Sequence, residues 1–160
     1  MADTAHHFAC TLHWTGAAKG PVADYETYSR DVRVDFEGKP SLELSAAPVF
    51  KGDPSRHNPE DLLVAALSSC HFLTYAAFCA KMGVVLVAYE DAATGVMERV
   101  ERVTRFTSVV LHPRVTVAKG TAPEKIELAK ALHAKAHAGC FIASSVNFPV
   151  THEATVVTEN

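Results

Sequence analysis

The sequence predicts a single α+β domain with the element order βββ-α-βββ-α-β and mostly antiparallel sheets. Segments rich in Val, Phe and Thr occur in two groups, a long uncharged helical segment separates these groups, and a second helical segment follows them. With 160 residues, of which 48% are hydrophobic and 21% charged, the chain suits one core. We expect one domain over residues 1–160: N-terminal strands in 1–50, a central helix at 58–82, and C-terminal strands with a second helix in 84–160.

Three strands are predicted before the central helix, at 6–14, 25–36 and 41–46. In the second segment, apolar residues at 32, 34 and 36 alternate with Arg33 and Asp35, which indicates a half-buried strand. Gly and Pro residues lie between the segments and predict turns.

The central helix has the clearest start signal in the chain. Asn58 suits the N-cap, Pro59 suits the first helical position, and Glu60 and Asp61 complement the positive end of a helix. Gly83 predicts its end. Residues 62–80 carry no Asp, Glu, Lys or Arg and are long enough to span a bilayer. Because polar residues interrupt this segment, we expect a buried central helix and no membrane span.

The C-terminal part predicts strands at 84–89, 96–100 and 104–117. Pro123 opens a second helix over 124–137, and Gly139 ends it. A tight turn or short helix is expected at 140–146, followed by a final strand at 150–157.

Net charge and cysteine content limit the functional classes to which the protein could belong. The net charge of −3 gives no basic surplus for binding nucleic acid. The first residues have neither the basic start nor the apolar core of a signal peptide, so we expect a cytoplasmic protein. In that reducing compartment, four cysteines are expected to be free or redox-active.

The four cysteines have different sequence contexts. Cys70 lies in the middle of the central helix among small residues, and Cys140 follows a helix end behind Gly139, where a thiol can be presented. Cys79 is nine residues after Cys70 and therefore lies on roughly the opposite face of the helix. Cys79 and Cys10 are interpreted as structural.

A zinc site is the alternative for the same region. His133 and His137 share a helix face, and Cys140 follows them; Cys70 or His71 would complete four ligands. Histidines on an alanine-rich helix are usually solvated, and the chain has neither a Cys-x-x-Cys pair nor a His-Glu-x-x-His motif, so we expect no metal.

The motifs resemble a known family. Asn58-Pro59-Glu60-Asp61-Leu62-Leu63 leading to Cys70, and a second cysteine seventy positions later in the segment His137 to Ala143, resemble the OsmC/Ohr hydroperoxide reductases. The resemblance extends over nearly the whole chain. Organic hydroperoxide resistance proteins usually have Pro after the second cysteine, whereas this chain has Phe141.

The resemblance implies a cofactor-free thiol peroxidase in which Cys70 attacks an organic hydroperoxide and Cys140 forms a disulfide with it. It also implies assistance from Arg30 and Glu60, an external dithiol reductant (lipoyl-linked or small-molecule) and an intertwined homodimer. Glu60 lies about 15 Å along the helix from Cys70, which suggests that another chain supplies it to the site. A non-enzymatic binding protein with packed cysteines is the alternative in another class.

Overall fold

The computed structural model describes residues 5–160. The chain divides into two compact units, one ending at Leu62 and the other spanning Leu63–Asn160. The single domain expected from the sequence stays a prediction.

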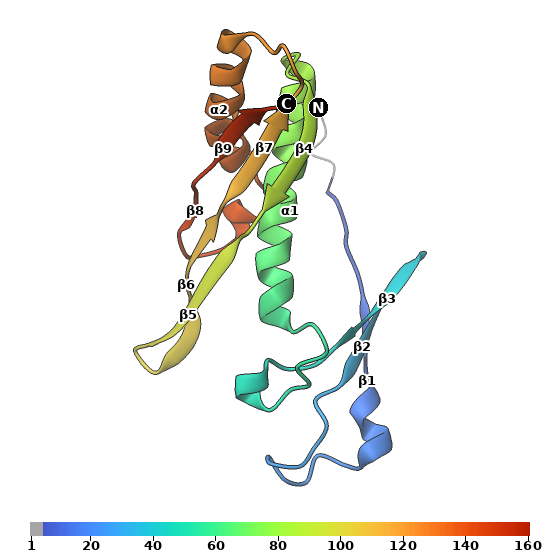
Figure 1. The fold of residues 1–160 in the computed structure, drawn as a ribbon. Coiled ribbons are helices and arrows are strands. Elements are labelled where there is room, and N and C mark those ends of the chain that lie inside the picture. Colours follow the sequence, from blue (N-terminus) through green and yellow to red (C-terminus); the bar gives the residue numbers. More distant parts are fainter. Residues whose placement is uncertain (1–4) are drawn as a thin grey trace. The chain divides into compact units, whose positions relative to one another are not determined.

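The first unit contains a three-stranded antiparallel sheet in the order β1-β2-β3 (Figure 1). Its strands are β1 (Thr11–Trp14), β2 (Val32–Phe36) and β3 (Lys39–Leu44). The second predicted strand was too long at its start, because 25–28 form a turn stabilised by a hydrogen bond from the Glu26 N–H to the Asp24 carboxylate. Short 3₁₀ turns, η1 (Thr15–Lys19) and η2 (Pro48–Phe50), complete the unit.

The central helix α1 spans Pro59–Lys81, as its start and stop signals predict. Asn58 is its N-cap: the side-chain oxygen accepts the Asp61 N–H at 2.8 Å. Gly83 has a φ of 67°, the left-handed conformation that ends a helix and that glycine adopts without strain. Only one stripe of α1 is buried within the chain: Leu67, His71, Tyr75 and Cys79.

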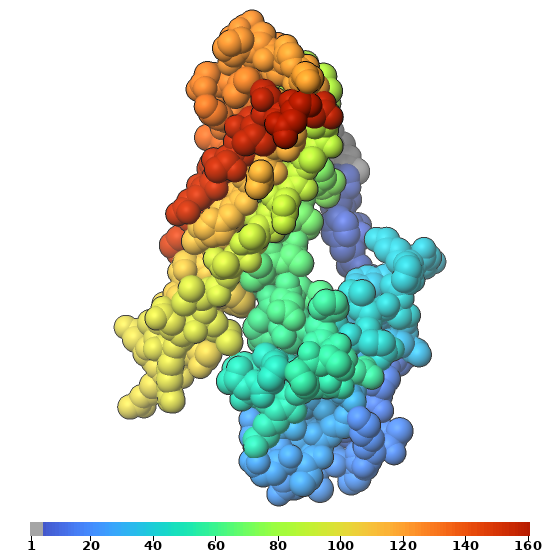
Figure 2. Space-filling view, viewed as in Figure 1, coloured from blue at the N-terminus to red at the C-terminus, as the bar shows by residue number. Residues whose placement is uncertain are grey.

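The second unit contains two three-stranded sheets, in the orders β4-β7-β9 and β5-β6-β8. The strands are β4 (Leu86–Asp91), β5 (Thr94–Val100), β6 (Val103–Leu111), β7 (Pro113–Val117), β8 (Val150–His152) and β9 (Thr155–Thr158). In Figure 2, the hairpin of β5 and β6 projects at the edge of this unit.

Two segments predicted as single strands each divide between these sheets. The segment 104–117 becomes β6 and β7, and 150–157 becomes β8 and β9. Pro113 explains the first break, because it has no N–H to continue a ladder and so marks a strand start. The divided strands pair in parallel, β6 with β8 and β7 with β9, within otherwise antiparallel sheets.

Helix α2 (Pro123–Ala138) packs against α1 and β7, and a 3₁₀ turn η3 (Ala143–Ser145) follows it (Figure 1). One apolar cluster joins the C-terminal half of α1 to β7 and α2 through Tyr75, Val115 and Leu132. A second cluster joins an earlier part of α1 to β6 and β8 through Leu67, Val109 and Val150. The middle of α1 therefore lies between two packed regions, and Cys70 is located there.

Candidate functional site

Cys140 lies in a turn that packs closely on α1. A Cβ built on Gly139 would lie 3.3 Å from Thr74 Cγ2 and 3.8 Å from Phe78 Cε2, so the glycine allows the turn to approach the helix. The backbone of the turn is fixed by hydrogen bonds from the Gly139 N–H to Lys135 O and from the Cys140 N–H to His137 O. Cys140 is only 1% exposed.

This turn brings Cys140 to Cys70, two residues that lie seventy positions apart in the sequence. Both are free thiols, and the Cys140 thiol hydrogen-bonds to Cys70. The backbone N–H groups of Phe141 and Ile142 and the hydroxyl of Thr74 also hydrogen-bond to Cys70. Groups from α1 and from the turn therefore lie close enough to the Cys70 sulfur to influence its pKa.

The surroundings shift the pKa values of the two thiols in opposite directions. Burial raises the pKa of Cys70, but the hydrogen bonds from Cys140, Ile142, Phe141 and Thr74 outweigh burial and hold the pKa below its usual value. Burial and the neighbouring Cys70 raise the pKa of Cys140. Cys70 is thus the thiol that ionises first, which suits a nucleophile, while Cys140 stays protonated.

Arg30 and Glu60 do not contact each other within residues 5–160. The Arg30 guanidinium donates to the backbone oxygens of Tyr28 and Tyr25 at 2.8 and 2.6 Å and stacks on both rings. Glu60 Oε2 is buried without a hydrogen-bond partner. Along the continuous helix α1, Glu60 remains ten residues before Cys70.

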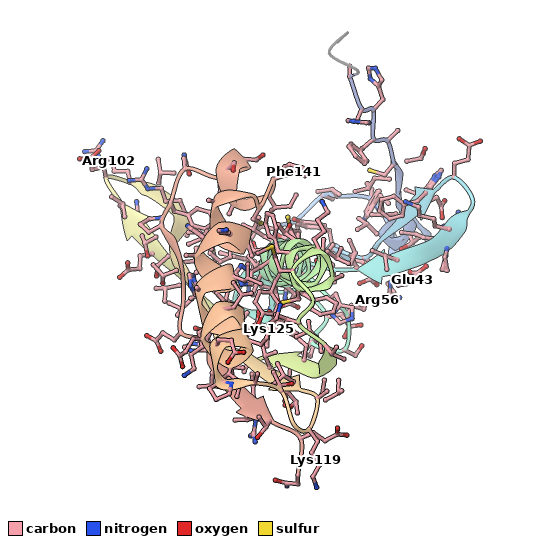
Figure 3. All side chains as sticks on the ribbon, turned by 90° about the horizontal axis from the view of Figure 1, so that it is seen from above. Glu43, Arg56, Arg102, Lys119, Lys125 and Phe141 are labelled. Atoms are coloured by element: carbon pink, nitrogen blue, oxygen red, sulfur yellow. The ribbon has the colours of Figure 1, made fainter. Side chains whose placement is uncertain are left out.

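The other arginines of the first unit have structural partners. Arg56 forms an ion pair with Glu43 at 2.7 Å, and Figure 3 shows these two labelled side chains next to each other. Arg33 pairs with Asp35 at 3.1 Å. Among the remaining cysteines, Cys79 is buried, with a pKa raised by burial, and Cys10 is exposed.

Two histidines near Cys70, considered above only as zinc ligands, form a buried pair that the sequence did not predict. His71 Nε2 on α1 lies 3.0 Å from His133 Nδ1 on α2, and both residues are 1% exposed. His133 was expected to be solvated; α2 instead turns it toward α1, where it stacks on Tyr75 with ring centroids 3.9 Å apart.

The zinc alternative through His133, His137 and Cys140 finds no support in the geometry. Across residues 5–160, no group of three or more His, Cys, Asp or Glu side chains is arranged to hold a metal ion. His133 Nδ1 is occupied by His71, and the Cys140 thiol by Cys70.

Fold and site together define an α+β protein with two facing thiols, one on a central helix and one in the turn after a second helix. A model of the OsmC-like protein family matches residues 52–155. The chain belongs to this family, as its motifs predict.

Individual relatives cover nearly the whole chain. An uncharacterized protein of Bacillus subtilis, YmaD, is 23% identical over 98% of this chain and 97% of its own length. A solved structure of an OsmC-like protein of unknown function from Vibrio cholerae is 31% identical, covers 94% of this chain and all of its own, and gives a TM-score of 0.84. A solved structure of an organic hydroperoxide resistance protein from Elizabethkingia anophelis is 19% identical and gives a TM-score of 0.69. The match covers 98% of this chain and 99% of that chain. The predicted α+β fold is therefore confirmed.

Proposed function

We propose that this protein is a metal-free, thiol-dependent peroxidase that reduces organic hydroperoxides to alcohols, with Cys70 as the attacking thiol and Cys140 as the resolving thiol. The observation that carries the proposal is the contact between the two thiols, which lowers the pKa of Cys70 and raises that of Cys140. A thiolate is the nucleophile in such chemistry, whereas the resolving thiol acts only afterwards.

The proposed reaction has three balanced steps. The Cys70 thiolate attacks the outer oxygen of the hydroperoxide, the O–O bond breaks, and the alkoxide takes a proton to leave as an alcohol, with Cys70 as a sulfenic acid. Cys140 then attacks this sulfur, which forms a disulfide and releases water. An external dithiol, lipoyl-linked or small-molecule, reduces the disulfide and is itself oxidised to a disulfide. A cytoplasmic location would supply such a reductant.

The preference for organic hydroperoxides has two supports. Family relatives include proteins described as organic hydroperoxide resistance proteins. Phe141, labelled in Figure 3, is 82% exposed, and its backbone N–H reaches Cys70, so an apolar side chain is available to a substrate next to the residue that contacts the thiol. We expect faster turnover of cumene hydroperoxide than of hydrogen peroxide, and the reverse order would remove this preference.

A homodimer and the roles of Arg30 and Glu60 belong to the same proposal. The buried, unpartnered Glu60 Oε2 calls for a donor, because an unsatisfied buried carboxylate oxygen is costly. We propose that dimer formation supplies this donor and completes the site with Arg30, which would stabilise charge on the thiolate and on the leaving oxygen. Arg30→Lys and Glu60→Gln variants should each lower the rate constant for the oxidation of Cys70.

The test is a free-thiol count and intact mass before and after one equivalent of cumene hydroperoxide. Wild type should lose two thiols, and Cys140→Ser should accumulate a sulfenic acid on Cys70 that dimedone traps. Cys70→Ser should keep all its thiols, and Cys79→Ser is the matched control that should behave as wild type. Unchanged thiols in wild type would contradict the proposal and favour a binding protein with packed cysteines.

A further inference from the structure

The buried pair of His71 and His133 is not used by the proposed chemistry. Each imidazole shares one nitrogen with the other at 3.0 Å, and the outer nitrogens, His71 Nδ1 and His133 Nε2, are buried without partners. One shared proton satisfies the inner pair as long as at least one ring is neutral and can accept it. Protonation of both rings would place two N–H donors face to face in a buried site.

The pair belongs to a closed chain of contacts that includes both thiols. His71 follows Cys70 directly on α1, and it bonds His133 on α2. One helical turn later, the His137 carbonyl accepts the Cys140 N–H, and the Cys140 thiol reaches Cys70. The contact between the two rings therefore fixes the end of α2 next to the segment of α1 that carries Cys70.

The other polar contacts between these helices lie further from Cys140. Tyr75 OH donates to Ala129 O at 3.0 Å, and Lys125 Nζ donates to Met82 O at 2.6 Å. Burial raises the pKa of Tyr75 far above neutral pH, so its contact does not change on acidification. The first half of α2 thus has pH-independent anchors, whereas the second half has the histidine pair.

The groups that surround the pair are mostly basic. His137 on α2 and His152 on β8 face the pair. Among residues 5–160, the acidic group that acts on the pair is Asp91 on β4, which already accepts hydrogen bonds from Ser68 Oγ and the His112 N–H. Burial, followed by His152, lowers the pKa of His71 to about 4, and burial, followed by the neighbouring His71 and His152, lowers that of His133 to about 3. A proton taken up by the pair therefore meets little compensation.

We propose that His71 and His133 are positioning residues: as a neutral pair they hold the end of α2, and with it Cys140, against Cys70, and uptake of protons releases this end while the start of α2 stays in place. The proposal concerns the position of Cys140 and does not depend on the peroxidase reaction.

The experiment is hydrogen exchange of the reduced, full-length protein measured by mass spectrometry across a pH series, corrected for the intrinsic pH dependence of exchange. Between pH 7.5 and about pH 5, protection of residues 139–146 should fall about tenfold or more, because the released histidines regain their ordinary pKa near 6.5. Protection of residues 124–130 should change little. Equal losses in both segments, or no loss in either, would overturn the proposal.

Variants identify the groups that titrate. The double variant His71→Gln/His133→Gln keeps two side chains that can share a hydrogen bond but cannot be protonated, and its exchange at 139–146 should be independent of pH. His112→Gln, which alters a more exposed histidine outside the pair, should retain the wild-type profile. If the double variant keeps the wild-type pH dependence of exchange, another group titrates and the proposal is contradicted. The proposal is also contradicted if His152→Gln alone removes this pH dependence. The wild-type comparison of the two halves of α2 decides the question even if the double variant does not fold.

Discussion

The sulfur of Cys70 is surrounded by neutral hydrogen-bond donors. The Cys140 thiol, two backbone N–H groups and the Thr74 hydroxyl stabilise its charged form and outweigh the opposing effect of burial. Neutral donors can lower a thiol pKa because they bond more strongly to a thiolate than to a thiol. An arginine is therefore not required to begin lowering this pKa, although a further charge would add to the effect.

Thr74→Val should raise the pKa of Cys70, since it removes one donor while nearly preserving side-chain shape. We expect alkylation of Cys70 near neutral pH to slow by about two- to tenfold, the range for one lost hydrogen bond. Rates of iodoacetamide labelling against pH measure this directly. Thr74→Ser keeps the hydroxyl and should match wild type; equal slowing in both variants would mean that packing, not the hydrogen bond, matters.

Some features of the site at the scale of single residues could be predicted from the sequence. The motif and the small residues around it identified Cys70, and the helix break identified Cys140. The donors from Phe141 and Ile142 are backbone N–H groups, which every residue type except proline has, so the residue types at 141 and 142 do not predict them. His133 was misjudged because its helix, rich in Ala and Lys, gives no clear apolar stripe.

At the scale of elements, the site depends on how closely the turn after α2 approaches α1. Gly139→Ala would place a methyl group 3.3 Å from Thr74 Cγ2, so the turn must shift by a few tenths of an ångström. Because the φ of Gly139 is −95°, the backbone itself accepts alanine. We expect normal folding but about tenfold slower disulfide formation after oxidation of Cys70, since small misplacements of reacting groups are costly.

Stopped-flow oxidation with dimedone competition measures this step, because slower resolution leaves more sulfenic acid to trap. Ala134→Gly, a substitution within α2 away from the turn, is the control. If dimedone traps the same amount of sulfenic acid in Gly139→Ala as in wild type, the turn can adjust to the added methyl group and the prediction is wrong.

The contact between α1 and α2 should make the stability of the protein depend on pH. Burial depresses the pKa of His71 to about 4 and contributes most to depressing that of His133 to about 3, below the value near 6.5 expected on unfolding. A depressed folded-state pKa gives stability that is complete above pH 6.5 or so and is lost as pH falls toward about 4. We expect the free energy of unfolding to fall on the order of 5 kcal/mol across this window, with about half of the change from each histidine.

Urea denaturation at a series of pH values checks this expectation. In the double variant His71→Gln/His133→Gln, the slope between about pH 6.5 and pH 4 should be much smaller. The same slope in wild type and variant would show that carboxylates, and not this pair, control acid stability.

The whole molecule leaves an extended apolar surface uncovered. In the most apolar 18-residue window of α1, with a mean hydropathy of 1.7, only 22% of the residues are buried within the chain. Leu73 on α1 is 66% exposed, and Val85 and Val87 next to the helix are 60% and 46% exposed. Length and composition would also allow α1 to cross a membrane, but core helices of water-soluble proteins pass the same test. Apolar surface of this kind usually marks an interface.

We therefore expect a homodimer, with a sedimentation mass near twice 17.2 kDa. Leu73→Glu should shift the equilibrium toward the monomer, because a charge at an apolar interface is costly. Val103→Glu is the matched control, since Val103 is 60% exposed at the β5–β6 hairpin and away from α1. A monomeric wild-type protein would contradict this prediction. Binding of the wild-type protein to lipid vesicles would also contradict it.

Local sequence signals were enough to predict the fold class and both helices with their ends, and they selected Cys70 and Cys140 as the candidate thiols. These features depend on local signals: an N-cap with Pro59, the glycines at 83 and 139, and a motif of adjacent residues. The tertiary structure alone decided that β6 and β7 belong to different sheets, that His133 is buried against His71, and that Cys140 reaches Cys70. Each of these depends on contacts between residues far apart in the chain, which local periodicity does not encode.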